Sequence, residues 1–404
     1  MTRAMSPITN GEGLERAGLL ALAAALGIVQ LTIFAWVPLV VAGVVWMVLM
    51  SRDRGMPSVP AFFWPLVALA AWTLVSSAFS MDPAASFYRD RQMLLFLVVP
   101  VTMRLAAGPR ATAVLDTIIA VGAASALIGI IQYLALGYDT LQQRPHGLLG
   151  HYMTYSGVLM LVICASAARL VFAERKWIWP AVAVPALLLA LVGSQSRNAW
   201  VGAVLAIACL LALRSWKLLI AMPVALAILL LAAPPSIRQR ALSSFDPYDP
   251  SNRDRVAMLE SGRLMIQDHP IVGVGPNMVP RAYVDKYKTA GAVDPAGSTG
   301  PQTRAHLHNV PVQLAAERGL PALAAWLWFV AVAIRGLFRL VRRGPSRPLA
   351  AAGLAAVVAM LAAGLFEHNF GDSEFLLLFL GLITLPCGAA QGPVRAEAGA
   401  ARAA

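Results

Sequence analysis

Apolar residues run along the chain in long, unbroken stretches that are separated by short polar breaks. We count twelve such stretches, at residues 16–32, 34–50, 60–79, 92–108, 112–136, 151–173, 177–193, 198–213, 216–234, 313–334, 349–367 and 374–390. A helix that crosses a bilayer needs about 20 mostly apolar residues. Because the stretches are continuous and do not alternate with polar residues, they predict helices and exclude strands. The pattern predicts an all-α polytopic membrane protein with about 12 transmembrane helices.

One segment, residues 235–312, is much longer and more polar than the other breaks. It divides the chain into residues 1–234 with nine predicted helices, the loop at 235–312, and residues 313–404 with three more helices and a tail. Within it, Asn252 to Asp268 is patterned as an amphipathic helix and Val279 to Lys288 as a shorter one, while 290–303 is typical of a flexible stretch. A loop of this length between membrane helices is usually functional.

The distribution of basic residues predicts the orientation of the helices. With the N-terminus inside, the short outer segments hold only Arg89, Arg91, Arg144 and Arg197, whereas the inner segments hold most of the other Lys and Arg residues. Positive charge in short loops favours the cytoplasmic side. We therefore expect both termini in the cytoplasm and the long loop outside.

Composition supports the same class of protein. Hydrophobic residues make up 59% of the 404 residues and charged residues only 13%, with a mean hydropathy of +0.69. Soluble domains carry roughly twice that share of charge, so a soluble enzyme and a disordered chain are excluded. The net charge of +12 would suggest nucleic acid in a soluble protein, but here we assign it to cytoplasmic loops and expect no nucleic-acid partner.

All six histidines fall on the predicted outer side. They are His146, His151, His269, His306, His308 and His368. Histidine titrates near neutral pH, so this clustering indicates chemistry on the outer face. His306 and His308 could bind a metal, pack structurally or act as a general base, but no third ligand follows at zinc spacing, and we predict no metal or other cofactor.

Two arginines stand where they could hold an anion. Ser196 is a candidate N-cap for the helix that starts at Arg197, which brings that arginine to the positive end of a helix dipole. Arg263 lies on the predicted loop helix and could contact phosphate with its planar fork, or simply face solvent. The nearby Gly273-Val274-Gly275 does not follow a strand, so it predicts a turn with a close backbone approach and no dinucleotide site.

In this order, the motifs resemble the O-antigen ligase and polymerase superfamily over about residues 80–370. The matching residues are Arg144-Pro145-His146-Gly147 with His151, Ser196-Arg197, Ser261-Gly262-Arg263, Asp268 through Gly275, and His306 through Asn309 followed by Gln313, Glu317, Arg318 and Gly319. The spacing from His308 to Gly319 is typical of the ligases.

The resemblance implies a metal-independent, inverting glycosyltransferase of the bacterial inner membrane, with its site facing the periplasm. The implied donor is a glycan on undecaprenyl diphosphate, and the implied acceptor is a sugar hydroxyl of the lipid A–core. On this basis we expect His308, or failing that His306, to be the base. We assign the pyrophosphate to Arg197 and Arg263, with Arg89 and Arg91 as further candidates. Supporting roles fall to Asn309, Glu317, Arg318, Ser196 and His151, where Glu317 would orient a histidine or pair with Arg318.

Several alternatives remain open at this point. The motifs do not separate a ligase from an O-antigen polymerase or a protein O-glycosyltransferase; the His308 to Gly319 spacing and the lack of a long extra domain favour the ligase. A different class, an exporter or flippase of an anionic lipid, should carry charged residues along a path through the membrane. Here the charges collect at one face. We expect a monomer.

Overall fold

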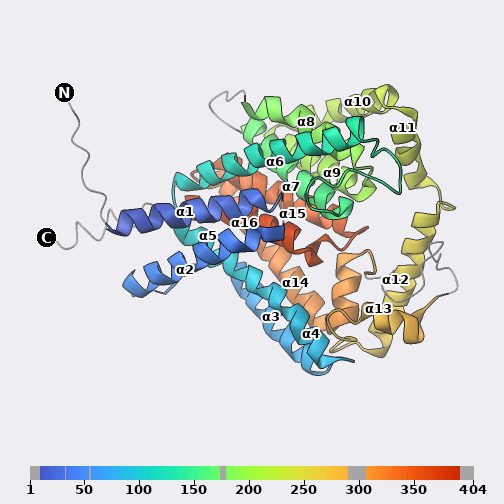
Figure 1. The fold of residues 1–404 in the computed structure, drawn as a ribbon, viewed down its shortest axis with the longest axis horizontal. Helices are drawn as coiled ribbons and strands as arrows, with labels where there is room; N and C mark the ends of the chain where they lie inside the picture. The colour runs from blue at the N-terminus through green and yellow to red at the C-terminus, as the bar shows by residue number, and fades with distance from the viewer. Residues whose placement is uncertain (1–9, 32, 54–55, 173–178, 290–305, 392–404) are drawn as a thin grey trace.

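The computed structural model describes residues 10–31, 33–53, 56–172, 179–289 and 306–391. Within these ranges the chain is helical throughout and forms no strand. Figure 1 shows a bundle of helices with α11, α12 and α13 gathered at one end, and α1 and α2 towards the other end. The described part of the chain is thus all-helical, as predicted.

Each of the twelve apolar stretches contains a helix. These are α1 (Asn10–Ile28), α2 (Trp36–Asp53), α3 (Phe63–Ala78), α5 (Val98–Leu105), α6 (Arg110–Ala135), α7 (Tyr152–Phe172), α8 (Trp179–Gly193), α9 (Arg197–Arg214), α10 (Trp216–Ala232), α14 (Val310–Arg343), α15 (Arg347–Gly364) and α16 (Ser373–Ala389). By length and apolar composition, 6 helices of the described chain qualify as membrane spans, namely α2, α6, α7, α9, α14 and α15. The helices α3, α8, α10 and α16 are apolar but shorter.

The centre of the bundle is built around α7 and α15. In each of these helices, 78% of the span is buried inside the protein, and α15 packs against α7, α9, α14 and α16. Small residues make such close packing possible, because they let helix backbones approach one another. At Gly202 of α9, for example, a Cβ would overlap Met160 of α7 and press on the Ala359 carbonyl of α15.

The long polar segment folds into helices that pack on α14. Its elements are α11 (Pro235–Leu242), η3 (Ser243–Phe245), α12 (Pro250–Asp268), α13 (Val279–Ala282) and η4 (Tyr283–Tyr287). Elsewhere the described chain forms the short elements η1 (Ile33–Ala35), α4 (Pro83–Asp90), η2 (Arg91–Leu97) and η6 (Asn369–Gly371). The two helices predicted in the loop are therefore confirmed, the second as α13 continued by η4. The predicted flexible stretch, 290–303, lies outside the described residues.

A break in α14 holds this segment in place. Gly319 interrupts the helix with φ 78° and ψ 173°, a conformation that favours glycine. The backbone of the Gly273–Gly275 turn lies in the break: Val274 N–H donates to the Ala316 carbonyl and Gly275 N–H to the Glu317 carbonyl, each at 2.9 Å. A Cβ at Gly273 would overlap the backbone of Glu317. The predicted close approach of the Gly-Val-Gly turn is confirmed.

Candidate functional site

A histidine and a buried glutamate meet between the start of α14 and the end of α15. Nδ1 of His308 lies 3.0 Å from Oε2 of Glu367, whose side chain is only 6% exposed. The other carboxylate oxygen accepts the His368 backbone N–H at 3.0 Å. Because an ionised carboxylate only accepts hydrogen bonds, Nδ1 must be the donor. This bond fixes the ring and leaves Nε2 as the free nitrogen of neutral His308.

The backbone at His308 and Asn309 sets the position of this imidazole at the start of α14. His308 has a positive φ of 53°, and Asn309 follows it as the N-cap of α14. The Asn309 carbonyl oxygen Oδ1 accepts Val312 N–H at 3.0 Å, and its Nδ2 donates to the Leu365 carbonyl at 3.1 Å. Asn309 thereby ties the start of α14 to the end of α15, the two elements that carry His308 and Glu367.

The charges of the pair shift both pKa values. The Glu367 carboxylate raises the pKa of His308 above its usual range, against the opposing effect of burial. Burial alone would raise the pKa of Glu367, but the nearby charge and hydrogen bond of His308 prevail and lower it to about 2. Glu367 is therefore ionised at neutral pH. An imidazole with a raised pKa is a stronger base, provided that it is deprotonated.

The second predicted histidine has a different environment. The His306 ring lies beside the His368 ring, with centroids 5.3 Å apart, and its Nδ1 is buried without a hydrogen-bond partner among the described residues. Burial lowers the pKa of His306, and it lowers the pKa of His368 further. Only His308 of the two predicted bases is bonded to a carboxylate in the part of the chain that the structure describes.

Glu317 forms an ion pair with Arg318. Oε2 accepts from Nη1 of Arg318 at 2.8 Å, and Oε1 accepts from Gln313 and from the Asn277 backbone, each at 2.9 Å. Of the two roles expected for Glu317, the pairing with Arg318 is confirmed. The carboxylate also anchors the chain after the Gly273–Gly275 turn to α14, about two turns into that helix.

Four arginines surround a cavity of ≈ 210 Å³ near the ends of α9 and α12. Its lining consists of Leu141, Arg144, Tyr152, Met153, Ser196, Arg197, Asn198, Arg240, Asp249, Pro250, Ser251 and Arg255. The loop before α7 supplies the first arginine, α9 the second, α11 the third and α12 the fourth. We call this the arginine cavity.

Arg197 is the most firmly held of the four. It is the first residue of α9, after Ser196 at the predicted N-cap position, although the Ser196 side chain makes no capping bond. Its guanidinium, 6% exposed, donates to Ser243 and Asn252 at 3.0 Å each and to Asp249 at 3.3 Å. These contacts tie α9 to the segment between α11 and α12 and so shape the wall of the cavity.

The arginine cavity carries an excess of positive charge. Asp249 is its one acidic lining residue. Burial and the charges of Arg197 and Arg144 lower the pKa of Arg240 to about 10, and burial also lowers the pKa values of Arg144 and Arg255. Such depression means that the protonated forms lack enough negative partners. An anion bound in the cavity would supply them, and arginine forks suit phosphate oxygens.

Arg255 connects the arginine cavity to the His308–Glu367 pair. It lines the cavity, and its Nε donates to the Phe366 carbonyl at 3.1 Å, one residue before Glu367. The Glu367 charge also raises the pKa of Arg255, against burial. The cationic cavity is therefore linked through Arg255 to the segment that carries Glu367, although His308 and Glu367 are not themselves lining residues.

Other predicted site residues lie elsewhere. Arg263 is on an exposed face of α12, where it pairs with Glu260 at 2.6 and 2.8 Å, and it is not a lining residue of the arginine cavity. Arg91 is exposed and stacks on Tyr88, with its guanidinium 3.4 Å from the ring centroid. His151 is exposed beside the Tyr152 ring. The structure thus does not bring Arg263 and Arg197 into one cavity, because α12 directs Arg263 to its outer side.

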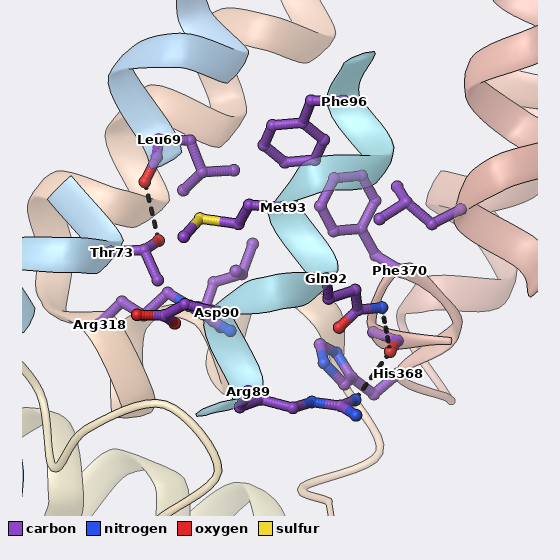
Figure 2. Close-up of a pocket in the computed structure, with 13 residues that line it drawn as sticks. Leu69, Thr73, Arg89, Asp90, Gln92, Met93, Phe96, Arg318, His368 and Phe370 are labelled. Carbon is purple, nitrogen blue, oxygen red and sulfur yellow. Dashed lines mark hydrogen bonds between the residues drawn. The ribbon is translucent and has the colours of Figure 1, made fainter. Parts of the chain in front are cut away.

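Arg89 lines a second, smaller cavity between α3, η2 and α14. Figure 2 shows its guanidinium beside His368, with Arg318 and Asp90 on the other side of the pocket. Arg89 donates to the Gly371 carbonyl at 3.0 Å. The cavity has a volume of ≈ 40 Å³, which is room for a few water molecules. Arg89 and Arg197 line different cavities.

Sequence reasoning missed the roles of Arg240, Arg255 and Glu367. The first two lie in the long loop at no fixed spacing from Arg197. Glu367 lies in the short polar stretch between the last two predicted helices, where an acidic residue is ordinary. The arginines come together only through tertiary contacts, such as the hydrogen bonds of Arg197 to Ser243, Asp249 and Asn252. Among the described residues, no group of three His, Cys, Asp or Glu side chains is placed to hold a metal ion.

Residues 181–327 match a family model described as O-antigen ligase. The matched segment runs from α8 to the middle of α14 and contains Arg197, Arg240, Arg255 and His308, whereas Arg144 and Glu367 lie outside it. No curated protein matched the chain. Over residues 181–327 the chain is therefore similar to the O-antigen ligase family, in agreement with the resemblance carried by its sequence motifs.

Proposed function

We propose that the protein is an O-antigen ligase, which transfers glycan from undecaprenyl diphosphate to a sugar hydroxyl of the lipid A–core. One observation carries the proposal: Arg255, which lines the arginine cavity, donates to the carbonyl of Phe366, the residue before the glutamate of the His308–Glu367 pair. A phosphate site next to a carboxylate-oriented base is the arrangement that glycosyl transfer from a lipid diphosphate requires.

The arginines act on the leaving group. When the bond between the sugar C1 and the phosphate oxygen breaks, the diphosphate gains negative charge. Guanidinium groups already in place stabilise that charge without reorganisation, typically by about 3–4 kcal/mol for one well-placed donor. We assign this role to Arg197 together with Arg144, Arg240 and Arg255. This revises the assignment from sequence, since Arg263, Arg89 and Arg91 do not line the arginine cavity.

His308 acts on the acceptor. Its Nε2 takes the proton of the acceptor hydroxyl as the oxygen attacks C1 from the side opposite the diphosphate, which inverts the configuration. The new C1–O bond forms, undecaprenyl diphosphate leaves, and Glu367 stabilises the imidazolium. A base of this kind contributes roughly 10²–10⁴-fold to the rate. His306 remains the alternative base, although no bond to a carboxylate holds its ring among the described residues.

We further propose the topology expected from the sequence: twelve spans in the inner membrane, cytoplasmic termini, and residues 235–312 in the periplasm. The charge bias of the short loops supports it. So does the arrangement in Figure 1, where α11, α12 and α13 gather at one end of the bundle. A lipid-linked donor could then present its diphosphate at the arginine cavity while its chain stays in the bilayer.

The test is reconstitution of the pure protein with a glycan on undecaprenyl diphosphate and a lipid A–core acceptor. A glycan joined to the acceptor supports the ligase. A lengthened lipid-linked glycan would instead indicate a polymerase, and transfer to a protein would indicate a protein O-glycosyltransferase. Movement of the lipid across vesicles without transfer would indicate a flippase. The His308→Ala variant, checked for correct insertion, is the negative control.

A further inference from the structure

The first turn of α9 reaches the arginine cavity with several hydrogen-bond donors unused. Backbone N–H groups in the first turn of any helix have no partner within that helix, and the positive end of the helix dipole favours anions there. At α9, the N-cap residue Ser196 leaves these groups without a side-chain cap. A second feature is needed to decide whether this end is a binding site.

Asn198 supplies that feature. It is 4% exposed and lines the arginine cavity, and its Nδ2 has no hydrogen-bond partner in the described part of the chain. Ser196, 3% exposed, lines the same cavity, and its Oγ is likewise without a partner among those residues. Buried donors left unsatisfied cost free energy, so they are normally paired. Two of them in one cavity wall indicate that the partner is a ligand.

The size of the cavity indicates which ligand. A volume of ≈ 210 Å³ has room for two phosphates, since one water molecule needs only about 10–15 Å³ on the same measure. The donors also form two groups. Ser196, Asn198 and the first amides of α9 belong to one helix end, whereas Arg240 and Arg255 come from α11 and α12.

We propose that Asn198, Ser196 and the first turn of α9 bind one phosphate of a diphosphate, while Arg240 and Arg255 bind the other. Both groups must be occupied for full affinity, so this wall selects a diphosphate over a monophosphate. The selection distinguishes a loaded or spent lipid diphosphate carrier from the lipid monophosphate. The inference rests on the proposed function. It adds that Asn198, Ser196 and the first turn of α9 let the cavity distinguish a diphosphate from a monophosphate.

The experiment measures binding of inorganic pyrophosphate and of orthophosphate to the full-length protein in nanodiscs by calorimetry. The variants are Asn198→Ala, and Asn198→Asp, which keeps the shape but removes the donor and adds a negative charge. Thr102→Val is the matched control, because Thr102 is also fully buried with an unpaired hydroxyl but lies in α5, outside the cavity.

We expect pyrophosphate to bind at least about tenfold more tightly than orthophosphate to the wild type, since a hydrogen bond to a charged group contributes about 1.5–3 kcal/mol. Asn198→Ala should remove most of this preference, Asn198→Asp should weaken pyrophosphate binding further, and Thr102→Val should retain it. Ser196→Ala gives an independent test if either Asn198 variant fails to fold.

Unchanged pyrophosphate preference in the folded Asn198 and Ser196 variants would overturn the inference. If Arg240→Ala abolishes pyrophosphate binding in that case, the proposed function survives and only the role of the α9 terminus is lost. If the wild type binds no pyrophosphate, or the Arg240→Ala variant binds it normally, the phosphate site itself is wrong and both proposals fall.

Discussion

Nδ1 of His308 lies 3.0 Å from Oε2 of Glu367, although two long helices, α14 and α15, separate the residues in sequence. The bond orients the imidazole and couples the charge of the two groups. Removing either partner should therefore affect glycan transfer in a way that can be separated from folding.

Glu367→Gln should slow transfer, because the imidazole loses the charge that stabilises its protonated form. We expect a loss within the range of roughly 10²–10⁴-fold for His308→Ala and a smaller one for Glu367→Gln, measured as kcat/KM in the reconstituted assay. Glu260→Gln is the matched control, since Glu260 is an exposed carboxylate on α12. A Glu367→Gln enzyme as fast as the wild type would contradict the pairing as a catalytic feature.

Transfer should rise with pH through the raised pKa of His308. The base works only when neutral, and its folded-state pKa lies above the ordinary value of 6.5, so activity increases as pH passes that raised value. Glu367→Gln removes the largest cause of the shift and should move the profile to lower pH. An identical profile in the two enzymes would show that another group controls the rate.

Stability should follow the opposite trend. Because its pKa is raised, His308 contributes to the free energy of unfolding fully below pH 6.5, and this contribution is lost as pH rises through the pKa of the folded state. Because its pKa is lowered, Glu367 contributes fully above pH 4.5, and its contribution is lost as pH falls towards about 2. The pair thus stabilises the fold most between pH 4.5 and 6.5. Thermal unfolding of wild type and Glu367→Gln should diverge most in that window.

Arg240 and Arg263 make a paired test of the arginine cavity. Arg240 lines the cavity, while Arg263 is exposed and paired with Glu260. Arg240→Ala should lower transfer by roughly 10²–10³-fold, with poor rescue by Arg240→Lys because an ammonium lacks the fork. Arg263→Ala should stay near the wild-type rate. The reverse ranking would restore the pyrophosphate role that the sequence assigned to Arg263.

Gly319→Ala should destabilise the protein. The position has φ 78°, and a Cβ there would overlap the Ile271 carbonyl, so the substitution forces strain of about 1–3 kcal/mol or expels the Gly273–Gly275 turn from the break in α14. A lower Tm in thermal unfolding is the expected result. Gly336→Ala in the same helix meets no atom within 4 Å and should be harmless. Equal Tm values for both variants would mean that the break is not under steric control.

Most of the secondary structure could be predicted because it depends on local pattern. The twelve apolar stretches each contain a helix, and the amphipathic residues 252–268 form most of α12. The close backbone approach of the Gly273–Gly275 turn was also predicted locally. The sequence did not indicate that Gly319 breaks α14 or that the turn fits into this break.

The site was predictable only in part. His308 and Arg197 stand out by residue type and position. Their partners do not: Glu367 reaches His308 from the end of α15, and Arg240 and Arg255 reach the cavity from α11 and α12. Arg263 was the best candidate in its motif, but a helix turns successive residues to different faces. The sequence alone did not indicate which face of α12 packs against α14.

The sequence by itself determined where helices form, because the period and length of apolar runs are local properties of the chain. It also determined which residue types are available for a site. Tertiary structure alone decided which charges meet, since that depends on how α9, α11, α12 and the end of α15 pack. Electrostatic interactions fall off steeply with distance and burial, so a site made of charges exists only once packing has brought its members together.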